Sequence, residues 1–290
     1  MKISVITASY NYAQYIEEAI KSVINQTYSD WELIIVDDGS SDNSVEIIKS
    51  YCKKDSRIKF FSHENNQNKG LKETLLLGIS HATGEWIAFL ESDDYFATDN
   101  LEKKVEVINK NPEAKLVFNK VNFITEEGVT KRRLKDLSLP QEKLSKLIFP
   151  RNMFYDFYIN NMILTFSCVM VEVKTLKNAN FNTPSEALLD WWLWIHLAYK
   201  TKFYYIDEKL TNWRLHSDSF VLTGKKPTLY LVQVQAYKDI YEKTGGNVNF
   251  LLFIIISNIK LFFIRSYRFI FRFPGKVFKI IKKFVDKRSQ

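Results

Sequence analysis

Two groups of acidic residues follow apolar segments in the N-terminal third of the sequence. Asp37 and Asp38 come after the first segment, and Glu91, Asp93 and Asp94 come after the second. Carboxylates gathered in one crevice repel one another unless a cation or hydrogen-bond donors neutralise them. A divalent ion with oxygen ligands, Mg²⁺ or Mn²⁺, meets this need where it also binds substrate phosphates. Either group alone is equally consistent with a helix-capping loop, but the two together favour a metal-assisted site.

The segments that must position these acids alternate between strand and helix patterns. Apolar or β-rich runs cover residues 3–7, 33–36, 59–61 and 86–90, and apolar residues at helical spacing cover 16–24, 45–51 and 70–82. This alternation implies an α/β domain with a largely parallel sheet. Ligands of such sheets bind outside the carboxyl ends of the strands. If the second and fourth strands are neighbours, both acidic groups face one crevice.

Two later segments and one change in composition complete the organisation. Residues 126–146 are polar and charged, which predicts a long loop or a short helix over the surface. The Trp-rich residues 188–199 predict a further helix. The composition changes at Thr244–Asn247. We therefore predict a main domain over residues 1–245 and an appendage over residues 246–290.

The overall composition is that of a globular protein with an uneven charge. The chain has 290 residues, of which 46% are hydrophobic and 26% charged, and this excludes wholesale disorder. The formal net charge is +8, but residues 260–290 hold ten Lys or Arg and one acid, so the rest is close to neutral. We therefore expect no nucleic-acid partner. Cys52 and Cys168 form neither a disulfide framework nor a zinc motif, which favours a reducing, cytosolic setting.

The basic appendage has the pattern of helices that lie in a membrane interface. Residues 250–264 are mostly apolar, but they are fewer than the roughly 20 residues that a spanning helix needs. Residues 265–287 alternate aromatic or aliphatic positions with Arg and Lys at helical spacing. We predict that residues 250–287 form amphipathic helices on an anionic membrane surface. A spanning helix and a helix that binds a partner protein stay open as alternatives.

Several motifs, in order along roughly residues 1–220, resemble glycosyltransferase family 2. They are Thr7–Asn11, Ser22–Tyr28, Trp31–Asp42, Gly84–Asp94, Leu189–Trp194 and Asn212–His216. The resemblance implies a GT-A fold, which is a Rossmann-like, mostly parallel sheet flanked by helices, here with a C-terminal amphipathic helical tail. It also implies an inverting enzyme with a UDP-sugar donor. On this basis residues 1–120 form the nucleotide-sugar half and residues 121–245 the acceptor half.

The same resemblance implies which residues bind the nucleotide. They are Ala8, Tyr10, Asp38, Lys69, Asp93 and Arg214. Tyr10 would stack on the base, although a packed strand-end aromatic is the simpler reading of this residue. Asp38 would hydrogen-bond a uracil-like edge, Asp93 would reach the ribose or the metal, and Arg214 would contact the diphosphate. Lys69 would replace positive charge, because Leu75 and Leu76 stand where many relatives have Arg and Asn.

The resemblance also implies the metal ligands and the general base. Asp94 and His216 would bind Mn²⁺ or Mg²⁺, and a His ligand suits Mn²⁺ somewhat better. Asp190 would remove the proton of the acceptor hydroxyl in a single displacement with inversion. A helix N-cap is the alternative reading of Asp190, and one residue could serve as both. Trp192 stands where the family has a second acid, which leaves one base.

Together these features predict an inverting hexosyltransferase. It would move a sugar from a UDP-sugar to a hydroxyl of a glycan or lipid-linked glycan, in surface polysaccharide or lipooligosaccharide assembly. We expect a cytoplasmic protein attached peripherally to the inner face of the cell membrane. Two alternatives remain: a non-catalytic membrane-bound relative that binds carbohydrate or nucleotide, and a nucleotidyltransferase, which would release pyrophosphate instead of UDP.

Overall fold

The computed structural model describes residues 1–125, 130–159, 161–216, 229–246 and 253–258. The chain forms two compact units, Met1–Pro227 and Thr228–Gln290. The described strands all lie in the first unit. They are β1 (Ile3–Ser9), β2 (Trp31–Asp37), β3 (Ile58–Ser62), β4 (Trp86–Phe89), β5 (Tyr95–Phe96), β6 (Leu116–Thr125), β7 (Val169–Glu172) and β8 (Phe203–Leu215).

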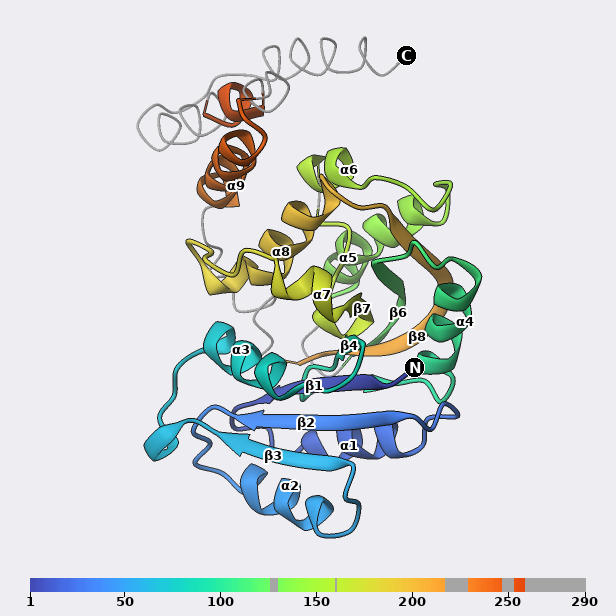
Figure 1. Cartoon of the computed structure of the whole chain (residues 1–290), viewed down its shortest axis with the longest axis vertical. Helices are drawn as coiled ribbons and strands as arrows, with labels where there is room; N and C mark the ends of the chain where they lie inside the picture. Colours follow the sequence, from blue (N-terminus) through green and yellow to red (C-terminus); the bar gives the residue numbers. More distant parts are fainter. Residues whose placement is uncertain (126–129, 160, 217–228, 247–252, 259–290) are drawn as a thin grey trace. The chain divides into compact units, whose positions relative to one another are not determined.

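These strands form one mixed sheet in the order β3-β2-β1-β4-β7-β6-β8-β5. The first four strands of this order are parallel, as Figure 1 shows for β1, β2 and β3. Strand β7 is antiparallel to both β4 and β6, and β6 is parallel to β8. The parallel sheet predicted for the N-terminal third is confirmed, and antiparallel pairing enters only with the later strands.

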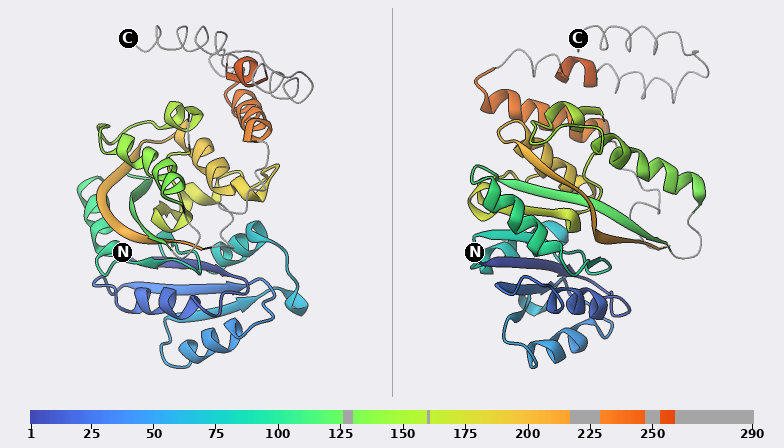
Figure 2. Two further views of the ribbon diagram at one scale, coloured as in Figure 1. Left: turned by 180° about the vertical axis from the view of Figure 1, so that it is seen from behind. Right: turned by 90° about the vertical axis from the view of Figure 1, so that its right-hand side faces the viewer.

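Helices cover both sides of the sheet (Figure 2). In the first unit they are α1 (Ile16–Ile24), α2 (Ser44–Cys52), α3 (Leu71–His81), α4 (Asn100–Lys110), α5 (Lys131–Leu144), α6 (Phe154–Ile159), α7 (Val173–Lys177) and α8 (Leu189–Ala198). Three short 3₁₀ turns accompany them, η1 (Glu64–Asn66), η2 (Phe166–Cys168) and η3 (Glu186–Leu188). Part of the segment that was predicted as a surface loop or short helix is the 14-residue helix α5.

The pattern of apolar residues explains which face each helix covers. Helix α1 buries Ile16, Ala19, Ile20 and Val23, which recur at helical spacing, in the same core as Ile3 and Val5 of β1. The opposite face of β1 carries Ile6, which lies against Gly78 of α3. A Cβ added to Gly78 would lie 2.7 Å from the Ile6 side chain, so this close packing requires glycine. The alternation of side chains along β1 therefore supplies both cores.

Strand β1 lies between β2 and β4, so the two strands that precede the acidic groups are not neighbours. A parallel strand between them keeps all three carboxyl ends at the same edge of the sheet. The crossover from β1 through α1 places β2 on one side of β1, and β4 later occupies the other side. The strand order thus differs from the simplest expectation but still gathers these strand ends.

The second unit contains α9 (Leu229–Lys243) and a helical segment at residues 253–258. The rings of Tyr237 and Phe253 are 5.8 Å apart, so these two segments contact each other. Within the part of the chain that the structure describes, no helix is long and apolar enough to cross a membrane. Most of the predicted membrane-binding segment, residues 250–287, lies outside the described residues. The predicted domain boundary after residue 245 stays a prediction.

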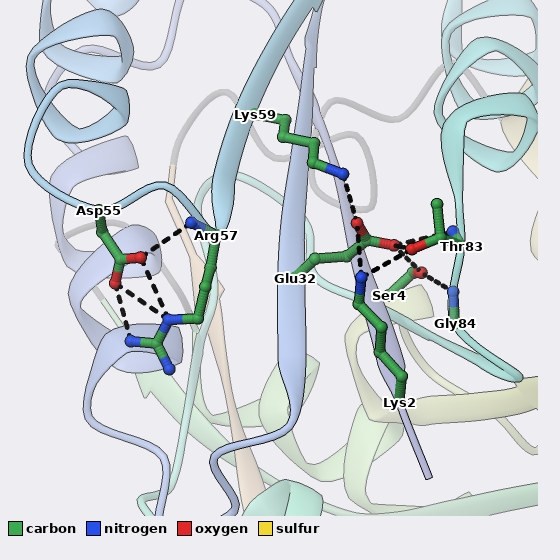
Figure 3. Close-up of polar contacts among 8 residues, drawn as sticks. All are labelled: Lys2, Ser4, Glu32, Asp55, Arg57, Lys59, Thr83 and Gly84. Atoms are coloured by element: carbon green, nitrogen blue, oxygen red, sulfur yellow. Dashed lines mark hydrogen bonds and ion pairs between the residues drawn. The ribbon is translucent and has the colours of Figure 1, made fainter.

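Glu32 of β2 ties the sheet together at the end opposite the acidic groups (Figure 3). Its side chain is 2% exposed, and Oε2 lies 2.7 Å from Lys59 Nζ and 3.4 Å from Lys2 Nζ. Oε1 accepts hydrogen bonds from Ser4 Oγ and from the main chain and hydroxyl of Thr83. Burial by itself raises the pKa of Glu32, but these hydrogen bonds outweigh burial and lower it to about 2. The carboxylate therefore stabilises β1, β2 and β3 while it is ionised.

We expect Glu32→Gln to lower the free energy of unfolding at pH 7 by about 3 kcal/mol, because two ammonium groups lose their buried partner. In the wild type this stabilisation is present above the ordinary Glu pKa of 4.5 and is lost as the pH falls toward about 2. Urea denaturation from pH 7 to pH 3 measures both effects. Asp55→Asn, at a more exposed pair with Arg57, is the control and should cost less than about 1 kcal/mol. An unaltered pH dependence in Glu32→Gln would contradict the assignment.

Candidate active site

A cavity of about 540 Å³ opens at the carboxyl ends of β1, β2 and β4. Five of the nine predicted site residues line it, and they are Ala8, Tyr10, Asp38, Asp93 and Asp190. The other four, Lys69, Asp94, Arg214 and His216, lie beside or behind its wall. The cavity thus joins residues from the two ends of the first unit, and it lies where ligands of open α/β sheets bind.

The end of β1 presents a small residue and an aromatic ring to the cavity. Ala8 has no side chain beyond Cβ, and Tyr10 is 47% exposed. The next residue, Asn11, has φ of 55° and accepts a hydrogen bond from Ser41 N at 2.8 Å. This contact ties the turn after β1 to the loop after β2, and it leaves the Tyr10 ring accessible.

The two aspartates at the end of β2 have different surroundings. Asp37 Oδ1 accepts hydrogen bonds from Gly39 N and Ser40 N, so its carboxylate shapes its own loop. Asp38 lines the cavity and accepts from the segment that begins α3. Its Oδ1 lies 2.7 Å from Lys69 N, and its Oδ2 lies 3.0 Å from Gly70 N. Lys69 therefore contacts Asp38 through its main chain, while its side chain is exposed.

Asp93 and His216 form a pair at one side of the cavity. Asp93 Oδ2 lies 3.1 Å from His216 Nε2. The imidazole is almost completely buried, and it packs against the rings of Tyr12 and Tyr15 with centroids 5.7 Å and 5.1 Å away. These tyrosines fix the plane of the ring, so Nε2 faces the Asp93 carboxylate.

Asp94 points into the protein and does not line the cavity. Its Oδ2 accepts a hydrogen bond from Ser167 Oγ at 2.6 Å, and its Oδ1 accepts one from Arg214 N at 2.9 Å. Burial, then the charges of Asp93 and Glu91, raise the pKa of Asp94 well above its ordinary value. These contacts join the loop after β4 to η2 and β8.

The guanidinium of Arg214 contacts Asp93, Glu18 and Tyr15. Its Nε donates to the main-chain oxygen of Asp93 at 3.0 Å, and Nη2 forms an ion pair with Glu18 of α1. The group also lies over the ring of Tyr15 at 4.8 Å. Arg214 therefore holds the Asp93 main chain, and its predicted contact with a diphosphate stays a prediction.

Asp190 is in the first turn of α8 and faces the cavity. Its Oδ2 accepts a hydrogen bond from Asn161 Nδ2 at 3.0 Å. Burial raises the pKa of Asp190 to about 6, although hydrogen bonds from Asn161 and from the main chain of Trp191 act against burial. Three buried tryptophans, Trp191, Trp192 and Trp194, anchor the helix behind it. A carboxyl with this pKa is mostly ionised at pH 7 and accepts a proton readily.

Glu91 and Thr165 also line the cavity, and neither was among the predicted site residues. Thr165 Oγ1 contacts Glu91 Oε2 and lies 3.1 Å from Asp94 Oδ2. Burial, and after it the charge of Asp93, raise the pKa of Glu91 to about 8. The Thr165 hydroxyl has one proton, so it can donate to only one of the two carboxyl groups. In the other contact it accepts a hydrogen bond, and the proton comes from the carboxyl group. The position of Glu91 in the acidic motif could have indicated that it belongs to the site, whereas no sequence pattern indicates Thr165.

Comparison with known proteins identifies the family. Residues 4–178 match Glycosyl transferase family 2, and the chain belongs to this family. The protein is therefore a glycosyltransferase. The uncharacterized glycosyltransferase MJ1057 of Methanocaldococcus jannaschii is 28% identical over 99% of this chain and 95% of its own length. The putative teichuronic acid biosynthesis glycosyltransferase TuaG of Bacillus subtilis is 31% identical over 75% of this chain and 80% of its own length. Some relatives are much longer, and the chain spans 37% of the uncharacterized glycosyltransferase RC0461 of Rickettsia conorii.

Solved structures show the same fold. S. aureus TarS 1–349 in complex with UDP-GlcNAc has a TM-score of 0.63 at 20% identity, over 83% of this chain and 67% of that one. The mannosyltransferase PcManGT from Pyrobaculum calidifontis, in complex with GDP-Man and Mn²⁺, has a TM-score of 0.60 at 12% identity, over 98% of this chain and 80% of that one. The predicted GT-A fold is confirmed.

The donor set beside the cavity fits a divalent cation that also binds substrate. Across the described ranges, no group of three or more His, Cys, Asp or Glu residues could hold a metal ion. Asp93 and His216 offer one carboxylate and one imidazole, which are ligands that Mn²⁺ accepts. A cation with two protein ligands takes its remaining ligands from phosphates and water.

We expect Thr165→Val to lower the free energy of unfolding by about 2 kcal/mol, because the hydroxyl that contacts two buried carboxyl groups is lost. Thr165→Ser keeps the hydroxyl and should lose less than half of this amount. Urea denaturation at pH 7 measures both variants. A loss in Thr165→Ser as large as or larger than that in Thr165→Val would contradict the assignment, because Thr165→Ser removes only the methyl group and Thr165→Val removes only the hydroxyl.

Proposed function

We propose that the protein transfers a hexosyl group, with inversion, from a UDP-sugar to a hydroxyl of a glycan or lipid-linked glycan. The observation that carries this proposal is the convergence of Tyr10, Asp38, Asp93 and Asp190 on one cavity. Three of them suit a nucleotide diphosphate, and the fourth suits an acceptor hydroxyl. TarS, which shares the fold, is solved with UDP-GlcNAc, and this supports a uracil nucleotide here.

The donor would lie along the ends of β1 and β2. The exposed face of Tyr10 offers a stacking surface for a base, and the small side chain of Ala8 leaves room for it. Asp38 offers acceptor oxygens for an N–H group of the base. Its two main-chain donors, Lys69 N and Gly70 N, hold the carboxylate in a fixed orientation.

Asp190 would act as the general base. As the acceptor oxygen attacks the anomeric carbon, its proton passes to Asp190 and the new C–O bond forms. The bond between the anomeric carbon and the diphosphate oxygen breaks on the opposite face, and UDP leaves with the electron pair. The amide of Asn161 holds Asp190 Oδ2 in place and helps to keep the carboxylate ionised.

Asp93 and His216 would hold a divalent cation, Mn²⁺ or Mg²⁺. When bound, such an ion supplies positive charge that stabilises the leaving diphosphate. The exposure of Asp93 to the cavity supports its selection as a ligand. The oxygens of Asp94 accept bonds from Ser167 and Arg214 N, so its contacts favour a supporting position behind Asp93.

The proposed sugar acceptor and the proposed cellular location are inferred from the sequence. Residues 250–287 carry the basic amphipathic pattern, which suits a peripheral position on the inner face of the cell membrane. A lipid-linked glycan would be available there. The name of TuaG refers to teichuronic acid biosynthesis, and this supports a place in surface polysaccharide assembly.

We expect Asp190→Asn to reduce sugar transfer at least about 100-fold, because the amide cannot accept the proton. Binding of UDP should stay within about threefold of the wild type, since Asp190 does not touch the nucleotide in this proposal. Release of UDP from a panel of UDP-sugars with Mn²⁺, followed by calorimetry with UDP, measures both effects. Asp136→Asn, at an exposed position of α5, is the control.

Wild-type turnover in Asp190→Asn would remove Asp190 as the base. Release of pyrophosphate instead of UDP by the wild-type protein would favour the nucleotidyltransferase alternative. Binding of UDP without turnover of any donor would favour the non-catalytic alternative.

The pH dependence of the reaction tests the same residue independently. Only the ionised form of Asp190 accepts a proton, and its pKa is raised to about 6. We therefore expect kcat/KM to be constant near pH 7.5 and to fall about tenfold per pH unit well below pH 6. Rates from pH 5 to pH 8, with UDP release as the readout, establish the profile. A rate that stays constant down to pH 5 would contradict the assignment.

A further inference from the structure

His63 lies directly behind Asp38, and the mechanism above does not use it. It follows the last residue of β3, and its side chain is 9% exposed. Its Nε2 is 3.0 Å from Thr74 Oγ1 and 3.6 Å from Asp38 Oδ1. Asp38 and Thr74 both line the cavity, so His63 supports its wall from the protein side.

The hydrogen bonds around Thr74 settle which group donates. Thr74 Oγ1 donates its one proton to the main-chain oxygen of Gly70 at 2.8 Å. The contact with His63 must then run the other way, with the imidazole Nε2–H donating to the threonine oxygen. This bond fixes the ring in its plane. The edge of the ring thus stays against Asp38 Oδ1 at a contact distance, 3.6 Å, that is too long for a second hydrogen bond.

The surroundings of Asp38 leave its carboxylate few open acceptor directions. Each carboxylate oxygen can accept about two hydrogen bonds. Oδ1 accepts from Lys69 N, and the His63 ring fills the space beside it. Oδ2 accepts from Gly70 N, and no second hydrogen bond to Oδ2 is formed by the part of the chain that the structure describes. Asp38 therefore offers one acceptor position to a ligand, and His63 is the side chain that closes the other.

One acceptor position matches one kind of base. Uracil presents a single N–H between two carbonyl groups, whereas guanine presents an N–H beside an amino group. A carboxylate recognises that guanine pair with both of its oxygens at once, which requires an open direction on each. We propose that His63 is a positioning residue that makes this site selective for uracil over guanine nucleotides. The proposal rests on the proposed function, in which Asp38 contacts the base of the donor.

The experiment measures the dissociation constants of UDP and GDP by calorimetry at one fixed Mn²⁺ concentration. We expect the wild-type protein to bind UDP at least about tenfold more tightly than GDP. His63→Leu removes the donor and the ring. The ratio of the GDP dissociation constant to the UDP dissociation constant should therefore fall about tenfold. His63→Gln places an amide N–H near the position of Nε2 and should restore the ratio to within about threefold.

A second pair of variants and a control separate selectivity from folding. Thr74→Val removes the acceptor of the His63 N–H and should lower the ratio in the same direction, whereas Thr74→Ser should restore it. His81→Leu is the control, because His81 is an exposed histidine in the last turn of α3 that stacks on Phe61. If His63→Leu does not fold, the Thr74 pair decides the question.

The possible outcomes distinguish the inference from the function on which it rests. A wild-type preference for UDP that is unchanged in His63→Leu and Thr74→Val would overturn the role of His63 and leave the proposed function intact. A wild-type protein that binds no UDP would overturn the proposed function, and the role of His63 with it. Tighter binding of GDP than of UDP by the wild type would also overturn both.

Discussion

Repulsion among carboxylates at the carboxyl end of β4 is the constraint on which the site depends. Glu91, Asp93 and Asp94 lie within a stretch of four residues shortly after β4. Burial makes it costly for all three carboxyl groups to be ionised together. The groups that offset this cost come from far along the chain. The hydroxyls of Thr165 and Ser167 contact the carboxyl groups of Glu91 and Asp94, and the main chain of β8 donates to Asp94. The acidic motif is therefore completed only when the later half of the sheet has formed.

The same part of the chain also connects the acidic loop after β4 to Asp190 on the other side of the cavity. Strand β7 follows η2 directly and pairs with β4, so Thr165 and Ser167 reach the acidic loop from the neighbouring strand. The chain then continues through α7 and η3 to α8, which carries Asp190 to the other side of the cavity. Phe89 of β4 packs against both Phe166 and Trp194, so one aromatic cluster supports the acidic loop and the helix of Asp190. Packing in the core thus fixes the distance across the cavity.

The sequence predicted the elements and motifs better than it predicted individual contacts. Periodicity identified the first four strands because each is short, apolar and followed by a turn. The position of β1 between β2 and β4 depends on crossover connections, which periodicity does not contain. The cavity-facing role of Asp93, with Asp94 turned inward, depends on donors more than 70 residues away. Likewise, the pairing of Arg214 with Glu18 joins β8 to α1, and no local pattern indicates it.

Two glutamates, Glu32 in β2 and Glu91 in the loop after β4, show how the surroundings of a carboxyl group decide its role. Glu32 and Glu91 are both held by hydroxyl groups. Glu32 also contacts two lysines, and its pKa falls to about 2. For Glu91, burial and after it the charge of Asp93 raise the pKa to about 8. At the end of the sheet opposite the cavity, Lys2 and Lys59 thus supply positive charge beside Glu32, and this stabilises the fold. At the cavity end it places carboxyl groups side by side, and the divalent cation that we propose would offset their charge together with that of a nucleotide diphosphate.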